Sequence, residues 1–403
     1  MTMASDTQMT QTQSRASQTA TAKPTNWKRI FGLREMGVYY ALLLLIFVLT
    51  MITTYLGQEN YLSIQNLTNV IYQSSLTSIM AVAMTVILIT GNFDLSVASV
   101  AALAAAVLVG NADAMGFWPA VALAMTVAMA LGLLNGSIVQ FVGINAFIVT
   151  LGTMTAVRGL VLIYTDGRSL SVKDPGVIAQ MKAFESGKND VFLLVVAAGI
   201  VCLALGIGSV IKSRSSGKSL RPAAVGTVIG GVILLLLALA SGGELVVRTP
   251  VVYMGIFTAV VWFVLSFTMV GRRIYAVGGN SEAARLSGIN VLRYKLMAFV
   301  LCSGAAGFAG VLFASRLRSI NPAGLTGAEL TVIAAAILGG TSLFGGAGSV
   351  IKTLAGALLL FSLTNGFNIL NLGANWQGLI EGIVVVVAAA IYTVGNQGRA
   401  KGH

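Results

Sequence analysis

Long apolar stretches alternate with short polar segments from residue 37 almost to the end of the chain. Most stretches approach the ~20 residues that an α-helix needs to cross the hydrocarbon core of a bilayer. The pattern predicts an all-α fold, a polytopic bundle of about twelve transmembrane helices, some of them short enough to be broken or re-entrant. The expected spans are 37–56, 71–90, 95–110, 117–142, 145–165, 191–211, 222–243, 250–270, 294–314, 328–345, 348–371 and 376–395.

The first 36 residues differ from the rest of the chain. Residues 1–27 are rich in Ser, Thr, Gln and Ala and show no apolar period, which predicts a disordered tail over 1–36. No apolar core precedes a small-residue cleavage site, so we do not expect a signal peptide. Lys28, Arg29 and Arg34 lie directly before the first span and predict a cytoplasmic N-terminus.

The placement of charge supports this topology. The formal net charge is +12, but the charges lie between apolar stretches, which indicates membrane orientation rather than nucleic-acid binding. Alternation from a cytoplasmic N-terminus assigns three further segments to the cytoplasm, and Glu282 is the one acid in these three. The basic residues of those segments (212–221, 271–293 and 396–403) are Lys212, Arg214, Lys218, Arg221, Arg272, Arg273, Arg285, Arg293, Arg399 and Lys401. We therefore expect a membrane domain over 37–396 and a cytoplasmic tail over 397–403.

Composition excludes several kinds of chemistry. Only 9% of residues are charged, against about 25% in soluble proteins, which again indicates a membrane protein. The single histidine, His403, leaves no histidine-based metal site or catalytic triad to consider. Cys202 and Cys302 lie inside apolar stretches and are expected to be small buried hydrophobes. No metal ion or cofactor is expected.

The segment 271–293 between two spans predicts a short helix. Asn280 is suited to cap its N-terminus, Glu282 falls in the first turn, where the helix dipole favours an acid, and Gly288 is suited to its C-terminal end. Such a helix would project from the membrane on the cytoplasmic side. The alternative is an ordinary amphipathic linker.

Polar groups inside a membrane are costly, so each is a candidate functional residue. Asn92 and Asp94 follow a span; Asp94 is expected either to cap a broken helix or to contact a transported ligand or act as a gate. Glu381 lies inside the last expected span, and Arg158 is its one possible partner. The two residues could form a structural ion pair or a gate, and the sequence does not decide between these roles.

A polar run near the C-terminus suits a neutral sugar, which needs amides, hydroxyls and aromatic faces. Asn365, Asn368 and Asn371 recur at i, i+3 and i+6 and so lie near one helix face, and Trp376 follows. Hydrogen bonding between helices is the alternative. The segments 91–100 and 341–350 both interrupt apolar stretches, as paired breaks in transport pathways do, although chance explains two such turns equally well.

Several motifs resemble one family of transport proteins. They are GRRIYAVGGN at 271–280 with EAARLSGI at 282–289, FDLSV at 93–97, FIVTLG at 147–152 with Arg158-Gly159, and Glu329-Leu330 with ILGGTSLFGG at 337–346. In this order they resemble the permeases of the ribose/xylose/arabinose/galactose family of ABC importers, over roughly residues 40–395. Ala98 and Phe93 depart from the family, which commonly has glycine and an aliphatic residue there.

The resemblance implies a type II ABC importer permease in the bacterial inner membrane, with both termini cytoplasmic. It implies a homodimer that binds two cytoplasmic ATPase subunits and a periplasmic sugar-binding protein. The loop helix would dock on the ATPase through Asn280, Glu282, Ala283, Arg285, Leu286 and Gly288. The hairpin at 191–243 is longer than in ribose-type permeases and resembles the xylose type, so D-xylose is the expected cargo.

ATP hydrolysis within the chain is not expected, and we predict a transport subunit rather than an enzyme. A P-loop needs G-x-x-x-x-G-K-S/T so that backbone amides surround the phosphates. Lys212-Ser213 and Lys352-Thr353 each follow an isoleucine, whose branched side chain blocks that approach.

Three alternatives stay open on the sequence alone. An ion-coupled secondary transporter usually carries several intramembrane acids, whereas here Asp94 and Glu381 qualify. A membrane-bound enzyme would need a nucleophile paired with a base. Other cargoes, namely ribose, galactose or a sugar-like signal molecule, are also open.

Overall fold

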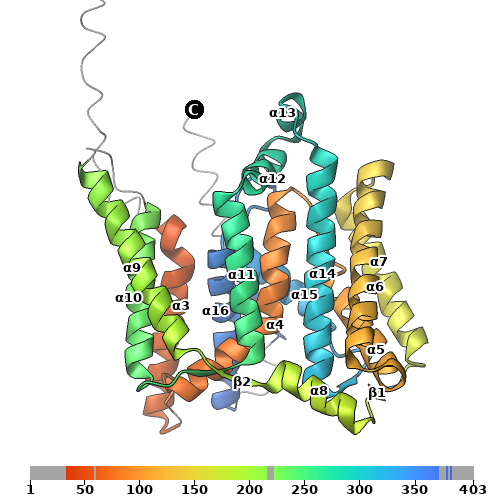
Figure 1. Cartoon of the computed structure of the whole chain (residues 1–403), viewed down its shortest axis with the longest axis horizontal. Helices are drawn as coiled ribbons and strands as arrows, with labels where there is room; N and C mark the ends of the chain where they lie inside the picture. The colour runs from red at the N-terminus through yellow and green to blue at the C-terminus, as the bar shows by residue number, and fades with distance from the viewer. Residues whose placement is uncertain (1–32, 59, 216–221, 372–377, 380–381, 384–403) are drawn as a thin grey trace, which may run out of the picture. The chain divides into compact units, whose positions relative to one another are not determined.

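The computed structural model describes residues 33–58, 60–215, 222–371, 378–379 and 382–383. These residues are mostly helical with almost no sheet, which confirms the all-α, polytopic fold (Figure 1). The helices are α3 (Leu33–Tyr55), α4 (Ile64–Ile89), α5 (Val97–Met115), α6 (Phe117–Ser137), the π-helical turn η1 (Ile138–Val142), α7 (Ala146–Tyr164), α8 (Pro175–Ser186), α9 (Phe192–Ser215), α10 (Pro222–Ala240), α11 (Thr249–Phe267), α12 (Met269–Gly279), α13 (Ser281–Leu286), α14 (Val291–Leu317), α15 (Ala328–Leu338) and α16 (Val350–Ile369).

Within these described residues, nine helical segments are long and apolar enough to cross a membrane. Two further expected spans are present as shorter apolar helices, in α10 and in α15. α4 has 26 residues, about 39 Å at 1.5 Å per residue, so it is long enough to cross completely rather than re-enter. α15 ends at Leu338 and is followed by a turn, as expected of a broken span. The last expected span, 376–395, lies mostly outside the described residues.

The chain divides into two compact units. The smaller contains the hairpin of α9 and α10, within residues 191–245. Its helices approach closely through glycines: a Cβ on Gly231 would lie 2.9 Å from the carbonyl oxygen of Gly199. Small residues bring membrane helices together in this way, because van der Waals contact rather than water exclusion holds them.

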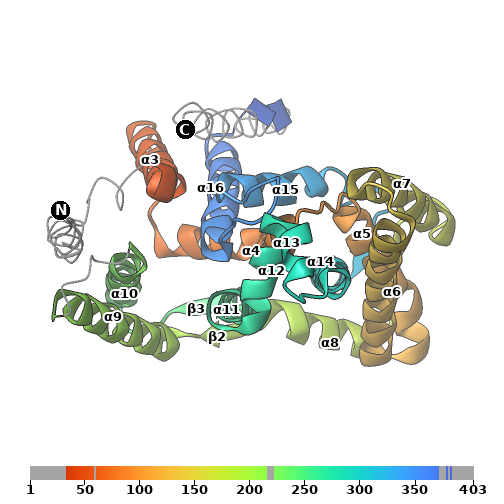
Figure 2. The ribbon, with the colours of Figure 1, turned by 90° about the horizontal axis from the view of Figure 1, so that it is seen from above.

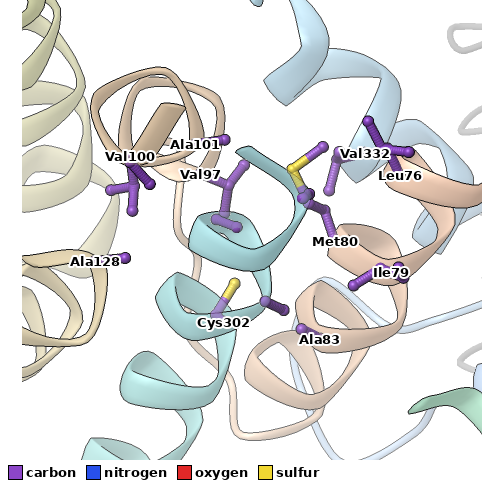
Figure 3. Packing of buried hydrophobic residues seen from close by; sticks show 14 of the residues in the cluster. Leu76, Ile79, Met80, Ala83, Val97, Val100, Ala101, Ala128, Cys302 and Val332 are labelled. Carbon is purple, nitrogen blue, oxygen red and sulfur yellow. The ribbon is translucent and has the colours of Figure 1, made fainter. Parts of the chain in front are cut away.

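The larger unit comprises residues 36–190 and 246–403 and is built around α4. The part of α4 from Ser74 to Ile89 is buried without a break, among α11, α14, α15 and α16 (Figure 2). The residues around it are small: α5 is rich in alanine, and a Cβ on Gly310 of α14 would collide with the backbone of Ala101. Figure 3 shows this packing, with Met80, Val97 and Cys302 meeting from three helices. Close packing fixes the position of α4 in the unit.

The two ends of this larger unit differ. One end carries α12 and α13, and the other carries α8 (Figure 1). Near α8, β1 (Leu170–Ser171) pairs with β4 (Ser319–Ile320), and β2 (Lys188–Asp190) pairs with β3 (Val246–Arg248), both antiparallel. The candidate sites lie at these two ends.

Candidate functional site

The short helix expected in the loop before α14 is present as α13. Asn280 is its N-cap, and its side-chain oxygen accepts a hydrogen bond from the Ala283 N–H at 2.9 Å. At the other end Gly288 has φ +78°, and Ile289 N–H donates to the carbonyl of Ala284 while Gly288 N–H donates to Arg285. This is a Schellman ending, in which the left-handed residue favours glycine.

The surface of α13 combines charge with an exposed apolar side chain. Glu282 and Arg285 pair at 2.9 Å, and both are largely exposed. Leu286 is 80% exposed, whereas Ala284 is buried and holds the helix against the rest of the chain. A rigid helix with one anchored face is therefore available to a partner.

α12 was not expected as a helix, and it connects α13 to the bundle. Gly278 lies so close to α4 that a Cβ would overlap the carbonyl of Ile89. Ile89 also accepts a hydrogen bond from Gly346 N–H at 2.9 Å. A Cβ on Gly345 would lie 2.7 Å from Gly278 O and 3.0 Å from Gly91 Cα. We call these four glycines, at positions 91, 278, 345 and 346, the glycine junction.

The junction brings together the two interruptions noted in the sequence. The one at 91–100 begins after α4, and the one at 341–350 leads into α16. Tyr275 of α12 donates its hydroxyl hydrogen to Gly348 O at 2.9 Å, and burial raises the pKa of Tyr275, so this donor keeps its proton. Within the bundle, the hydroxyls of Thr85 and Thr353 lie 2.6 Å apart and join α4 to α16. Movement of α12 would therefore act on both helices.

A polar cavity of about 580 Å³ lies at the other end of the unit. The first turns of α4 form one wall and the β2–β3 pair forms the other. Its lining residues are Ser63, Gln65, Asn66, Thr68, Asn69, Tyr72, Lys188, Val246, Val247 and Arg248. Amides and hydroxyls dominate this lining, and they are groups that bind a neutral polyhydroxyl ligand by hydrogen bonds.

A buried ion pair holds the cavity wall. Glu185 of α8 is fully buried; one of its oxygens accepts from Tyr72 Oη at 2.6 Å and from Arg316 Nε at 2.7 Å. The guanidinium groups of Arg248 and Arg316 lie 4.3 and 4.1 Å from the centre of the Tyr72 ring, close enough for cation–π attraction. A buried carboxylate needs such partners, and losing one leaves an uncompensated charge. The sequence analysis did not predict this network, because its members lie far apart in the chain.

The asparagines of α16 do not share one environment. Asn365 is buried, and its amide nitrogen donates to Asn66 Oδ1 at 3.0 Å, next to the polar cavity. Asn368 is exposed. Asn371 lies beyond the end of the helix, with φ +52°, in the left-handed conformation that asparagine tolerates after a helix. Trp376 and Glu381 lie outside the described residues.

Asn92 and Asp94 are buried between α4 and α5. One oxygen of Asp94 accepts hydrogen bonds from Ser96 N–H at 2.9 Å and from Ser96 Oγ at 2.5 Å, at the start of α5. Ser96, not Asp94, is the N-cap of α5, so Asp94 holds the turn before the helix and does not cap the helix itself. Asn92 donates to Thr90 Oγ1 at 3.1 Å. Arg158 donates to Thr326 Oγ1 at 2.8 Å, and its pairing with Glu381, which lies outside the described residues, stays a prediction.

The chain is similar to known transport permeases. Residues 66–389 match a family described as the permease component of the branched-chain amino acid transport system. The chain belongs to this permease family. The ribose import permease protein RbsC of Escherichia coli K12 is 35% identical over 363 residues, 89% of this chain and 94% of RbsC.

Two further relatives extend the comparison. The xylose transport system permease protein XylH of Escherichia coli K12 is 33% identical over 373 residues, 89% of this chain and 92% of XylH. RbsC of Bacillus subtilis 168 is 29% identical over 361 residues, 89% of this chain and 92% of that protein. No solved structure matches. The resemblance to monosaccharide ABC permeases is thus confirmed, while ribose and xylose permeases are similar to nearly the same degree.

Proposed function

We propose that the chain is the membrane-spanning permease subunit of an ATP-driven sugar importer. The observation that carries the proposal is that α4 and α16 each reach both candidate sites. One end of each helix meets α12 around the glycine junction, and at the other end Asn66 and Asn365 are joined beside the polar cavity. A permease driven by an external ATPase needs such a connection, because two sites are coupled only through an element that both of them bias.

α13 is the proposed contact with the ATPase. Asn280 and Gly288 set its ends, and Glu282, Arg285 and Leu286 are exposed on it, with Ala283 beside them. Motion of the ATPase would move α13 and α12 together and act through the junction on α4 and α16. ATP hydrolysis is assigned to that partner, as expected from the absence of a P-loop sequence in this chain.

The polar cavity is the proposed start of the sugar path. Gln65 and Asn69 line it with side-chain amides that can bond a sugar, and Asn365, joined to Asn66, extends the path towards α16. Asn368, Asn371 and Trp376 are proposed to continue it, and a role there for Asn92 and Asp94 is less favoured than their structural one. In this scheme the α13 end and both termini face the cytoplasm, and the cavity faces the periplasm and its sugar-binding protein. A second copy of the chain would complete the pathway.

D-xylose is the proposed cargo. The support is the α9–α10 hairpin, which resembles the longer hairpin of xylose-type permeases, together with the similarity to XylH. The similarity to RbsC is as great, so ribose, also a pentose, is the alternative cargo.

Transport in proteoliposomes tests the proposal. The chain is reconstituted with its ATPase and sugar-binding protein, and uptake of labelled D-xylose and D-ribose is measured with ATP or with a proton gradient alone. We expect saturable uptake that requires ATP and both partners, with xylose preferred. Uptake by the chain alone under a proton gradient would contradict an ABC importer, and a preference for ribose would contradict the cargo only.

A further inference from the structure

A long apolar groove lies on the side of the larger unit formed by α6, α11 and α14. Its volume is about 960 Å³, as large as pockets that enclose small ligands. Met129 of α6 and Ile256 of α11 form its walls, and Gly304 and Ala305 of α14 lie along it, where their small side chains leave space. Neither the proposed coupling element nor the polar cavity includes this groove.

The groove extends along α14 from Asn290 and Arg293, near α13, to Phe308. At 1.5 Å per residue, positions 290 to 308 span about 27 Å, close to the ~30 Å hydrocarbon core of a bilayer. At the far end it reaches Tyr253, whose hydroxyl donates to Phe184 O of α8 at 3.4 Å. The groove therefore follows the direction in which lipid chains lie.

One end of the groove is basic. Arg293 is exposed, and its guanidinium is absent from the three ion pairs found among the described residues. The acid of the same loop, Glu282, already pairs with Arg285. The groove is apolar along its length and positively charged at one end, so it is complementary to an amphiphile with an anionic head.

We propose that this groove binds one anionic phospholipid. Its phosphate lies at Arg293 and Asn290, and an acyl chain runs past Met297 to Gly304. Basic pockets between membrane helices on the cytoplasmic side bind anionic headgroups in this way. Flexible methionines fit a mobile chain, and filling the hollow restores dispersion contacts that the lining otherwise lacks. If a second copy of the chain occupied the groove instead of a lipid, that copy would have to place an acidic group against Arg293.

The headgroup contact is tested by exchanging Arg293. Wild type, Arg293→Gln and the control Arg272→Gln are placed in nanodiscs of equal phosphatidylglycerol and phosphatidylethanolamine, and retained lipid is counted by native mass spectrometry. We expect one phosphatidylglycerol per chain in wild type and in the control. Arg293 is exposed, so Arg293→Gln should not affect folding. This variant should lower the preference for phosphatidylglycerol over phosphatidylethanolamine roughly five-fold.

The acyl contact is tested by filling the groove. Gly304→Leu should reduce retention of both lipids, whereas Gly152→Leu, on the exposed face of α7 where a Cβ meets open space, should not. Unchanged phosphatidylglycerol preference in Arg293→Gln would overturn the proposal. A second result would also overturn it: Gly304→Leu separates a dimer into single chains but retains as much lipid as wild type. The groove would then be an interface between two copies of the chain.

Discussion

Glycine at four positions determines how closely three backbones meet at the α12 end of the larger unit. Gly278 faces the carbonyl of Ile89, and Gly345 and Gly346 lie against Gly278 and Gly279. Any side chain at Gly278 would have to push α12 away from α4, since backbone atoms cannot move aside as a flexible side chain can. The junction is therefore a contact of fixed geometry, suited to transmitting motion.

Replacing Gly278 by alanine should disrupt this contact. We expect Gly278→Ala to destabilise the protein by about 1–3 kcal/mol, as overpacking does, and to reduce sugar-stimulated ATP hydrolysis by the complex. Gly279→Ala is the matched control, because a Cβ there meets nothing within 4 Å. Thermal unfolding in detergent and the ATPase rate are measured for both variants, and identical behaviour of the two would contradict the importance of the junction.

At the scale of residues, local signals were predictable and distant ones were not. Asn280, Glu282 and Gly288 were correctly assigned to the ends and first turn of α13, because capping depends on neighbours in sequence. The burial of Glu185 was missed, because its partners Tyr72 and Arg316 lie 113 and 131 positions away. Asn371 was expected on a helix face but lies beyond the helix end, a boundary that periodicity does not fix.

At the scale of elements, α13 is a short capped helix with an exposed charge pair, and α12 connects it to the bundle. α12 escaped prediction because Gly271, Gly278 and Gly279 are poor helix formers, and tertiary contacts outweigh their low propensity. The apolar helices themselves were predicted well, since length and hydrophobicity define a span. Their packing partners, and hence the polar cavity between α4 and β3, could not be predicted from a one-dimensional pattern.

The docking role proposed for α13 can be tested by reversing one charge. Glu282→Arg replaces an exposed pair worth under about 1 kcal/mol, so the permease should remain folded. We expect it to lose sugar-stimulated ATP hydrolysis, because two like charges would face the partner. Glu244→Arg makes the same exposed charge change in the other unit and should have no effect. Normal coupled hydrolysis in Glu282→Arg would reject α13 as the ATPase contact.

At the scale of the whole larger unit, α4 and α16 are the elements common to both sites. They are joined by the threonine pair in the bundle and by the amide pair beside the cavity, at 2.6 and 3.0 Å. Two helices fastened at both ends move together rather than independently. Nucleotide binding by a partner at α13 should therefore change the polar cavity at the opposite end.

Labelling of a thiol introduced into the cavity measures this directly. In a Cys202→Ser background, with Cys302 fully buried, Asn69→Cys places a thiol in the cavity lining and Ala179→Cys places a control thiol on the exposed face of α8. Maleimide labelling rates are compared in the reconstituted complex without nucleotide and with ATP trapped. We expect a several-fold change in the labelling rate of the Asn69→Cys variant, none in the Ala179→Cys variant, and loss of the change when Glu282→Arg is added. An unchanged rate in the Asn69→Cys variant, measured in an actively transporting complex, would contradict coupling between the two ends.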